Sequence, residues 1–204
     1  KQSNLLALAS YKRAVSNFVN IVTNENIKVM FDQRGDNSYT DGKTVTISSK
    51  MDDKEFDPTV GLALHEGSHI KLTDFSTLRK ISNYDFPQPI GYSYLSDLEG
   101  KHHMSYEGVR SWVASTIKDL LNVIEDRRID YYIYSTSPGY KGYYHAMYDK
   151  YFNAKIIDKG LKSSECRTED WDSYMFRIIN ITNANRDLDA LPMLRKVWEL
   201  IDLK

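Results

Sequence analysis

The feature that most constrains this chain is the pentad His65-Glu66-Gly67-Ser68-His69, which stands inside a segment typical of an α-helix. Four residues turn a helix by about 400°, so the two histidines project from one face, one turn apart. At that spacing two imidazoles can bind a single metal ion, and the carboxylate of Glu66 projects beside them. The pentad therefore predicts a helix that holds a metal ion and carries a general base next to it.

The residues around the pentad favour a helix with this face turned inward. Asp57 and Pro58 are a good N-cap and first-turn pair. Leu62 and Leu72 extend the stripe that the histidines begin. The alternative interpretation is a pair of core histidines bonded to backbone groups. The metal site is favoured because two imidazoles and a carboxylate are costly to bury without a partner.

The composition is that of an ordinary globular protein. Its 204 residues are enough for a substantial core, and we expect a single domain over residues 1–204. The 27 basic and 28 acidic residues give a net charge of −1, which argues against a nucleic-acid or anionic-membrane partner. The apolar runs are too short for a membrane-spanning helix. The single cysteine, Cys166, excludes an internal disulfide and a thiolate zinc site, which fits a reducing compartment, so we expect a cytoplasmic protein.

The hydrophobic pattern predicts an α+β chain that is mainly helical. Two short β-rich runs, residues 27–31 and 44–48, are expected to form a hairpin or two neighbouring strands. Residues 44–47 are expected to be an exposed edge that pairs with an extended substrate. A stretch rich in proline and glycine, residues 86–100, is expected to be an irregular connection. Helices are predicted over residues 5–23, 58–72, 106–134, 142–157, 171–182 and 191–203.

The long helix over residues 106–134 supplies a third ligand for the metal. Glu125 is the only charge in a stripe that is otherwise apolar, formed with Val113, Ile117, Leu121 and Ile129. A lone carboxylate in such a stripe needs a partner, and a metal ion is a natural one. Asp126 lies one step around the helix, with Asn122 and Asp130 a turn away, and suits the orientation of a ligand histidine. A surface ion-pair cluster over residues 125–128 is the alternative.

A hydrolytic site would also need a donor for the negative charge that develops on the substrate. His145, His103 and the tyrosines between residues 131 and 144 are the candidates, and His145 is the one we single out. Each of these histidines is more often a solvated or packed residue than a functional one.

Three blocks of sequence, taken in order, resemble a known family. They are SYTDGKTVTIS (residues 38–48), LHEGSHIKLTDF (64–75) and LLNVIEDRRIDYYIYSTSPGY (120–140). Together they resemble the metallopeptidase-like domain that precedes a von Willebrand factor A domain in CobT-like proteins and in related phage and bacterial proteins. The resemblance covers residues 27–140.

The resemblance implies a zincin-like fold of the gluzincin type, with zinc on His65, His69 and a glutamate that maps onto Glu125. The separation between His69 and Glu125 is longer than in the best-known gluzincins, so Asp126 stays an alternative ligand. No D-x-S-x-S motif occurs, so we expect any von Willebrand factor A domain to lie outside this chain, which would then be a piece of a longer protein.

The expected function is zinc-dependent hydrolysis of peptide bonds in a peptide or protein substrate, with metal-activated water as nucleophile and Glu66 as general base. The rival hypothesis is a catalytically silent zinc-binding module that interacts with proteins. The resemblance implies a MoxR-type AAA+ ATPase as its partner in that case.

Overall fold

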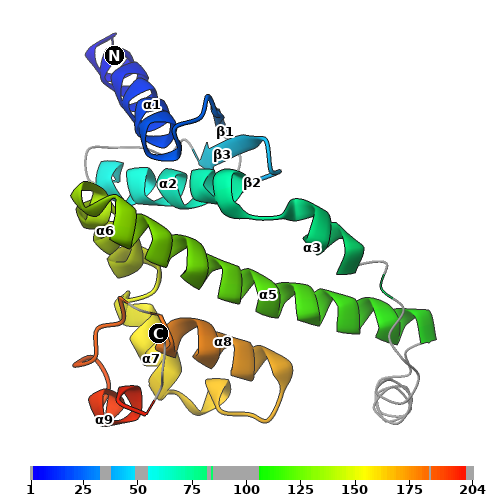
Figure 1. The fold of residues 1–204 in the computed structure, drawn as a ribbon. Helices are drawn as coiled ribbons and strands as arrows, with labels where there is room; N and C mark the ends of the chain where they lie inside the picture. The colour runs from blue at the N-terminus through cyan, green and yellow to red at the C-terminus, as the bar shows by residue number, and fades with distance from the viewer. Residues whose placement is uncertain are drawn as a thin grey trace. The chain divides into compact units, whose positions relative to one another are not determined.

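The computed structural model describes residues 2–32, 38–48, 55–81, 84, 106–183 and 185–200. These residues are mostly helical and contain one small three-stranded sheet, which confirms the α+β class at a coarse level (Figure 1). The irregular connection expected over residues 86–100 lies outside the described residues, as does His103.

The chain divides into two compact units, residues 1–71 with 129–204 and residues 72–128. Two helices reach this division: α2 (Phe56–Leu72) ends at it, and α5 (Tyr106–Thr136) continues through it without a break. The second unit also contains α3 (Phe75–Ile81). The first unit contains α1 (Gln2–Thr23), β1 (Lys28–Asp32), β2 (Tyr39–Thr40), β3 (Thr44–Ser48), α6 (Lys141–Tyr151), α7 (Lys155–Lys162), α8 (Trp171–Ile181), α9 (Leu194–Trp198) and the 3-10 turns η1 (Pro138–Tyr140) and η2 (Ser164–Cys166).

The sheet has the strand order β1-β3-β2. The prediction of neighbouring strands is confirmed, since β1 pairs with β3 in parallel. The hairpin is instead formed by β2 and β3, which are antiparallel. Gly42 adopts a φ of 87° in its turn, a conformation that L-residues with side chains seldom adopt. Asp41 accepts hydrogen bonds from the amides of Lys43 and Thr44, which lower the pKa of its carboxyl.

The prediction that residues 44–47 form an exposed edge is wrong. Strand β3 lies between β1 and β2, so its backbone is paired on both sides. Val45 and Ile47 are buried and belong to the core, where they meet residues of α1, α2 and α6. The edges of this sheet are β1 and β2, neither of which was predicted as a site for substrate pairing.

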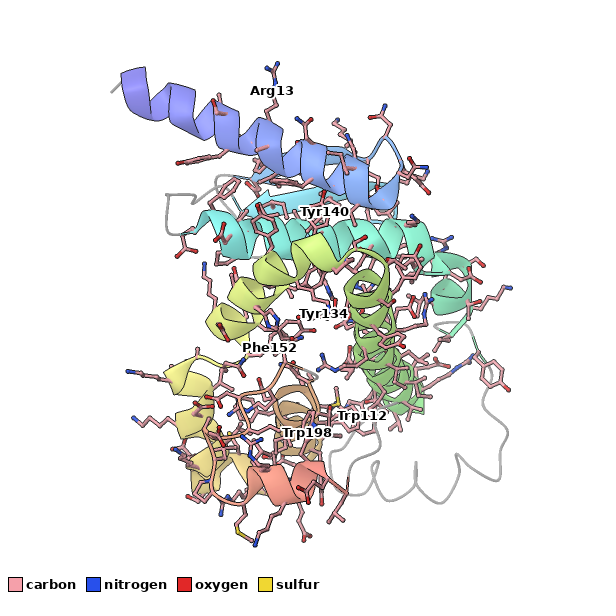
Figure 2. All side chains as sticks on the ribbon, turned by 60° about the vertical axis from the view of Figure 1, so that its left-hand side comes forward. Arg13, Trp112, Tyr134, Tyr140, Phe152 and Trp198 are labelled. Atoms are coloured by element: carbon pink, nitrogen blue, oxygen red, sulfur yellow. The ribbon has the colours of Figure 1, made fainter. Side chains whose placement is uncertain are left out.

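Two glycines allow α2 to approach its neighbours closely. A Cβ atom at Gly61 would stand 2.3 Å from the carbonyl oxygen of Tyr143 on α6, and one at Gly67 would stand 2.7 Å from Cγ1 of Val19 on α1. Aromatic rings complete the contact between α1 and the start of α6, since the ring of Phe18 lies 5.9 Å from that of Tyr140 and 5.4 Å from that of Tyr143 (Figure 2). The helix that carries the pentad is therefore packed closely against α1 and α6 inside the first unit.

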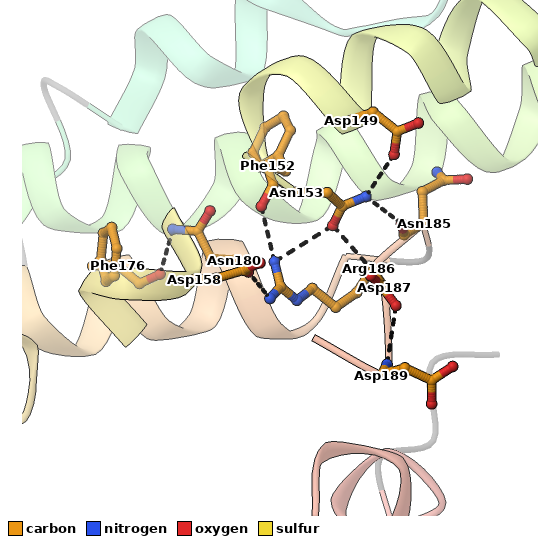
Figure 3. A network of polar contacts seen from close by, with 10 residues as sticks. All are labelled: Asp149, Phe152, Asn153, Asp158, Phe176, Asn180, Asn185, Arg186, Asp187 and Asp189. Atoms are coloured by element: carbon orange, nitrogen blue, oxygen red, sulfur yellow. Dashed lines mark hydrogen bonds and ion pairs between the residues drawn. The ribbon is translucent and has the colours of Figure 1, made fainter. Parts of the chain in front are cut away.

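The helix predicted over residues 142–157 is two helices, α6 and α7, with a break between Tyr151 and Lys155. Buried Arg186 binds the break: its Nη1 donates to the carbonyl of Phe152 at 2.9 Å, and its Nη2 pairs with Asp158 (Figure 3). Asn153 donates to Asp149 and to the carbonyl of Asn185. The break could not be predicted from the local sequence, because Arg186, which binds both sides of it, comes about thirty positions later.

The remaining helices follow the predictions with small differences. Helix α8 ends within one residue of its expected end, and α9 covers part of the predicted residues 191–203. Helix α3 was not predicted; Asp74 starts it by accepting hydrogen bonds from Ser76 and Thr77, which lower the pKa of its carboxyl. Within the described residues, no helix combines the length and the apolar character needed to cross a membrane.

Candidate metal centre

The three candidate residues of the pentad lie on α2, and its two histidines stand one turn apart, as helical periodicity predicts. His65 and His69 lie one turn apart, with ring centroids 4.9 Å from each other and ring planes nearly perpendicular. His69 is buried, whereas His65 and Glu66 are partly exposed. Two imidazoles on one helix face are thus brought together at a partly accessible position.

Asp130 on α5 orients the first histidine. Its Oδ1 lies 2.9 Å from Nδ1 of His65. A neutral imidazole that donates from Nδ1 to a carboxylate carries its lone pair on Nε2, which is the arrangement of many histidines that bind metals. Its Oδ2 accepts a hydrogen bond from the hydroxyl of Tyr148 on α6. The two oxygens of Asp130 therefore contact side chains of two different helices, α2 and α6.

The third member of the group is Asp126. One ligand atom each from His65, His69 and Asp126 lie within 4.8 Å of one another, which makes them the one candidate metal-binding group among the described residues. Asp126 and Asp130 are four residues apart in a continuous helix, so both project from the same side of α5. The helix that presents one carboxylate to Nδ1 of His65 thus presents the second to the metal-binding face.

Glu125, the ligand we favoured from the sequence, lies outside this group. Its Oε1 accepts a hydrogen bond from Thr73 at 2.6 Å, and both of its oxygens accept from Arg128 at 2.6 and 2.7 Å. The pKa of Arg128 is raised by this pairing. Arg128 also donates to the carbonyl of Leu72 at 2.6 Å. The carboxylate of Glu125 thus belongs to an ion pair at the end of α2, and the acid that lies with the two histidines is Asp126, which the sequence left as an alternative.

The other predicted residues also lie outside the group. The side chains of Asn122 and His145 are exposed, and the ring of His145 meets the ring of Tyr134 edge-on at 5.8 Å. The role of orienting a histidine, predicted for Asp126, is filled by Asp130 one turn later. The sequence could have indicated that Asp126 and Asp130 act together, because residues four apart in a helix project from the same side.

Two buried tyrosines of α6 were not singled out from the sequence. Tyr144 and Tyr148 are one turn apart and almost fully buried. Burial raises the pKa of Tyr144 well above its ordinary value, and the charge of Asp130 raises it further. Tyr144 therefore keeps its proton throughout the neutral range. In the sequence both residues resemble ordinary core aromatics, so no local signal distinguishes them.

A cavity of about 450 Å³ opens on the same unit. Thr59 and Leu62 of α2 form one wall of it, and they lie on the side of the helix that Glu66 continues. The other lining residues come from the sheet, from the start of α2 and from α6: Ser38, Ile47, Ser48, Glu55, Lys150 and Tyr151. Glu55 and Lys150 form an ion pair there. The cavity is thus lined by both apolar and polar side chains.

The chain was compared with protein-family models, with curated proteins and with solved structures, and none of them matches it.

Proposed function

We propose that this chain is a metal-dependent hydrolase of the zincin type that cleaves peptide bonds. The observation that supports it best is that Asp126 of α5 lies close to His65 and His69 of α2. Helix α2 also carries Glu66, the candidate general base. The resemblance of three sequence blocks to metallopeptidase-like domains supports the same proposal.

The donor set fits zinc. Two imidazole nitrogens and one carboxylate oxygen are common ligands of catalytic zinc, and three protein ligands leave a position for water. His65, His69 and Asp126, whose ligand atoms lie within 4.8 Å of one another, would hold the ion. When bound there, zinc would acidify a water molecule and polarise a substrate carbonyl.

The chain's own residues divide the remaining tasks. Glu66 accepts the proton of the attacking water and returns it to the leaving amine nitrogen. Asp130 holds the ring of His65 in the orientation and tautomer that a ligand needs.

The cavity beside α2 provides space for a substrate side chain. Leu62 precedes Glu66 by one helical turn, a rise of about 6 Å, which is close to the length of two residues of an extended peptide. A peptide whose scissile bond lies at Glu66 would therefore place a side chain two residues away near Ile47 and Leu62.

The first test is the metal content of the purified chain beside its Asp126→Asn and Glu125→Gln variants. We expect one zinc per parent chain, strongly reduced occupancy in Asp126→Asn and retained zinc in Glu125→Gln. A parent chain that takes up no added zinc would contradict the proposal at its base.

The second test separates hydrolysis from binding alone. Glu66→Gln keeps the size of the side chain and removes the base, so this variant should retain zinc and lose cleavage of a quenched fluorescent peptide library by about 100-fold or more. A parent that binds zinc and cleaves no faster than Glu66→Gln would favour the silent zinc-binding module instead.

A further inference from the structure

Tyr148 lies behind the proposed metal centre without contributing a ligand to it. Its residue is 2 % exposed, and its hydroxyl donates to Oδ2 of Asp130. The other oxygen of the same carboxylate lies 2.9 Å from His65. A continuous chain of hydrogen bonds thus runs from α6 through α5 to a histidine of α2.

We propose that Tyr148 is a positioning residue of the metal centre, which acts by fixing the carboxylate of Asp130 in the plane that serves His65. This inference rests on the proposed function, since it assumes that His65 binds a metal.

The position of the acceptor explains why a second donor matters. Asp130 is almost fully buried, so water cannot replace a lost partner at Oδ2 without rearrangement. A carboxylate held at one oxygen can still turn about its Cβ–Cγ bond, whereas one held at both oxygens cannot. The hydroxyl of Tyr148 therefore fixes the orientation of the Asp130 carboxylate. This carboxylate in turn fixes the ring of His65 and the direction in which Nε2 points.

The donor is itself held firmly. The start of α6 meets α2 at Gly61, where a Cβ atom would stand 2.3 Å from the carbonyl oxygen of Tyr143. At the other end of α6, the ring of Phe152 lies 5.1 Å from the ring of Tyr148, and Arg186 binds the carbonyl of Phe152 (Figure 3). The hydroxyl of Tyr148 is thus presented by a helix fixed at both ends.

Tyr144 provides an internal control. It lies one turn earlier on α6 and is equally buried, but its hydroxyl has no hydrogen-bond partner among the described residues. Substitution by phenylalanine at either position removes one buried hydroxyl and keeps the ring. A difference between the two variants in metal binding therefore reports the bond to Asp130 rather than packing.

The experiment measures zinc affinity by competition with a chromogenic chelator for the parent, Tyr148→Phe, Tyr144→Phe and Asp130→Ala, and for Asp130→Ala combined with Tyr148→Phe. We expect Tyr148→Phe to weaken zinc binding by about 10-fold or more, the loss typical of groups that orient a metal ligand, and Tyr144→Phe by less than about 3-fold. In the Asp130→Ala background, Tyr148→Phe should change affinity by less than about 2-fold, because its target is gone. Visible spectra of the cobalt-loaded proteins should change in Tyr148→Phe and stay unchanged in Tyr144→Phe.

Equal affinities for Tyr148→Phe and Tyr144→Phe in a zinc-binding parent would overturn this inference and leave the proposed function intact. A loss in Tyr148→Phe that persists in the Asp130→Ala background would also overturn it, since the effect would then come from packing. A parent that binds no zinc would overturn the proposed function and this inference together.

Discussion

Tyr134 on α5 is a residue whose ionisation should be visible in the folded protein. Its hydroxyl donates to Asn185, and burial raises its pKa to about 12, with Asp130 and Asp149 adding to the shift. A tyrosine in the unfolded chain titrates near 10, so the folded state favours the neutral phenol. The resulting stability is fully present below pH 10 and is lost as the pH rises toward 12.

The measurement is an ultraviolet titration of the parent and of Tyr134→Phe at 295 nm. The difference should show one tyrosine with a midpoint near 12, and the stability of Tyr134→Phe should depend less on pH between about 10 and 12. A midpoint near 10 in the difference spectrum would contradict the burial of this hydroxyl.

The choice between Glu125 and Asp126 shows how far the sequence reaches at the scale of a residue. The pentad is local, so helical periodicity alone places His65, Glu66 and His69. Glu125 was favoured because it interrupts an apolar stripe, but Arg128 and Thr73 satisfy its carboxylate. A stripe shows that a charge needs a partner, and only the folded chain shows which partner it has.

Helix α2 depends on a close approach that a single methyl group should prevent. In Gly61→Ala the added Cβ would overlap the carbonyl of Tyr143, which cannot move without shifting α6. We expect a loss of about 2–3 kcal/mol in the free energy of unfolding, measured by urea denaturation. Gly142→Ala is the matched control, because a Cβ there meets nothing within 4 Å, and the better helix propensity of alanine should add about 0.5–1 kcal/mol. Similar effects of both substitutions would show that α2 and α6 are not in tight contact.

The junction between α6 and α7 depends on a buried cation. Replacing Arg186 with methionine leaves Asp158 and the carbonyl of Phe152 without their donor, and we expect a loss of about 3–5 kcal/mol in the free energy of unfolding. Arg195→Met is the comparison: it breaks an ion pair with Asp189 in which both side chains are exposed, so the loss should stay below about 1 kcal/mol. Comparable losses in the free energy of unfolding from the two substitutions would mean that Arg186 does not stabilise the junction between α6 and α7.

At the scale of an element, the sequence predicted where two strands lie but not how the sheet is paired. The sequence indicated two short strands at the right places, because turn-forming residues flank β-rich runs. It did not indicate the two-residue strand β2. Because β2 pairs with β3, β3 is the central strand, and β1 and β2 are the edges of the sheet. A strand of two residues is too short to show an alternation, so its existence depends on pairing alone.

Metal removal should lower the stability of the whole molecule. A ligand that binds only the folded chain adds about 2.7 kcal/mol when present at 100 times its dissociation constant. For a chain of this size that corresponds to roughly 5–10 °C in the midpoint of thermal unfolding. We expect a shift of this order between zinc-saturated and chelator-treated protein, measured by differential scanning calorimetry, and little shift in Asp126→Asn. A parent midpoint that does not respond to zinc would contradict the proposed centre.

The groups of the proposed metal centre are distant in sequence, since His65 and Asp130 are 65 positions apart. Closing a loop of that length costs entropy, so we expect the two histidines of α2 to come together first and the acids of α5 to join them later in folding. Contacts completed after the transition state change the rate of unfolding and leave the rate of folding almost unaffected. Bound metal would therefore determine how long the folded protein lasts rather than how quickly it forms.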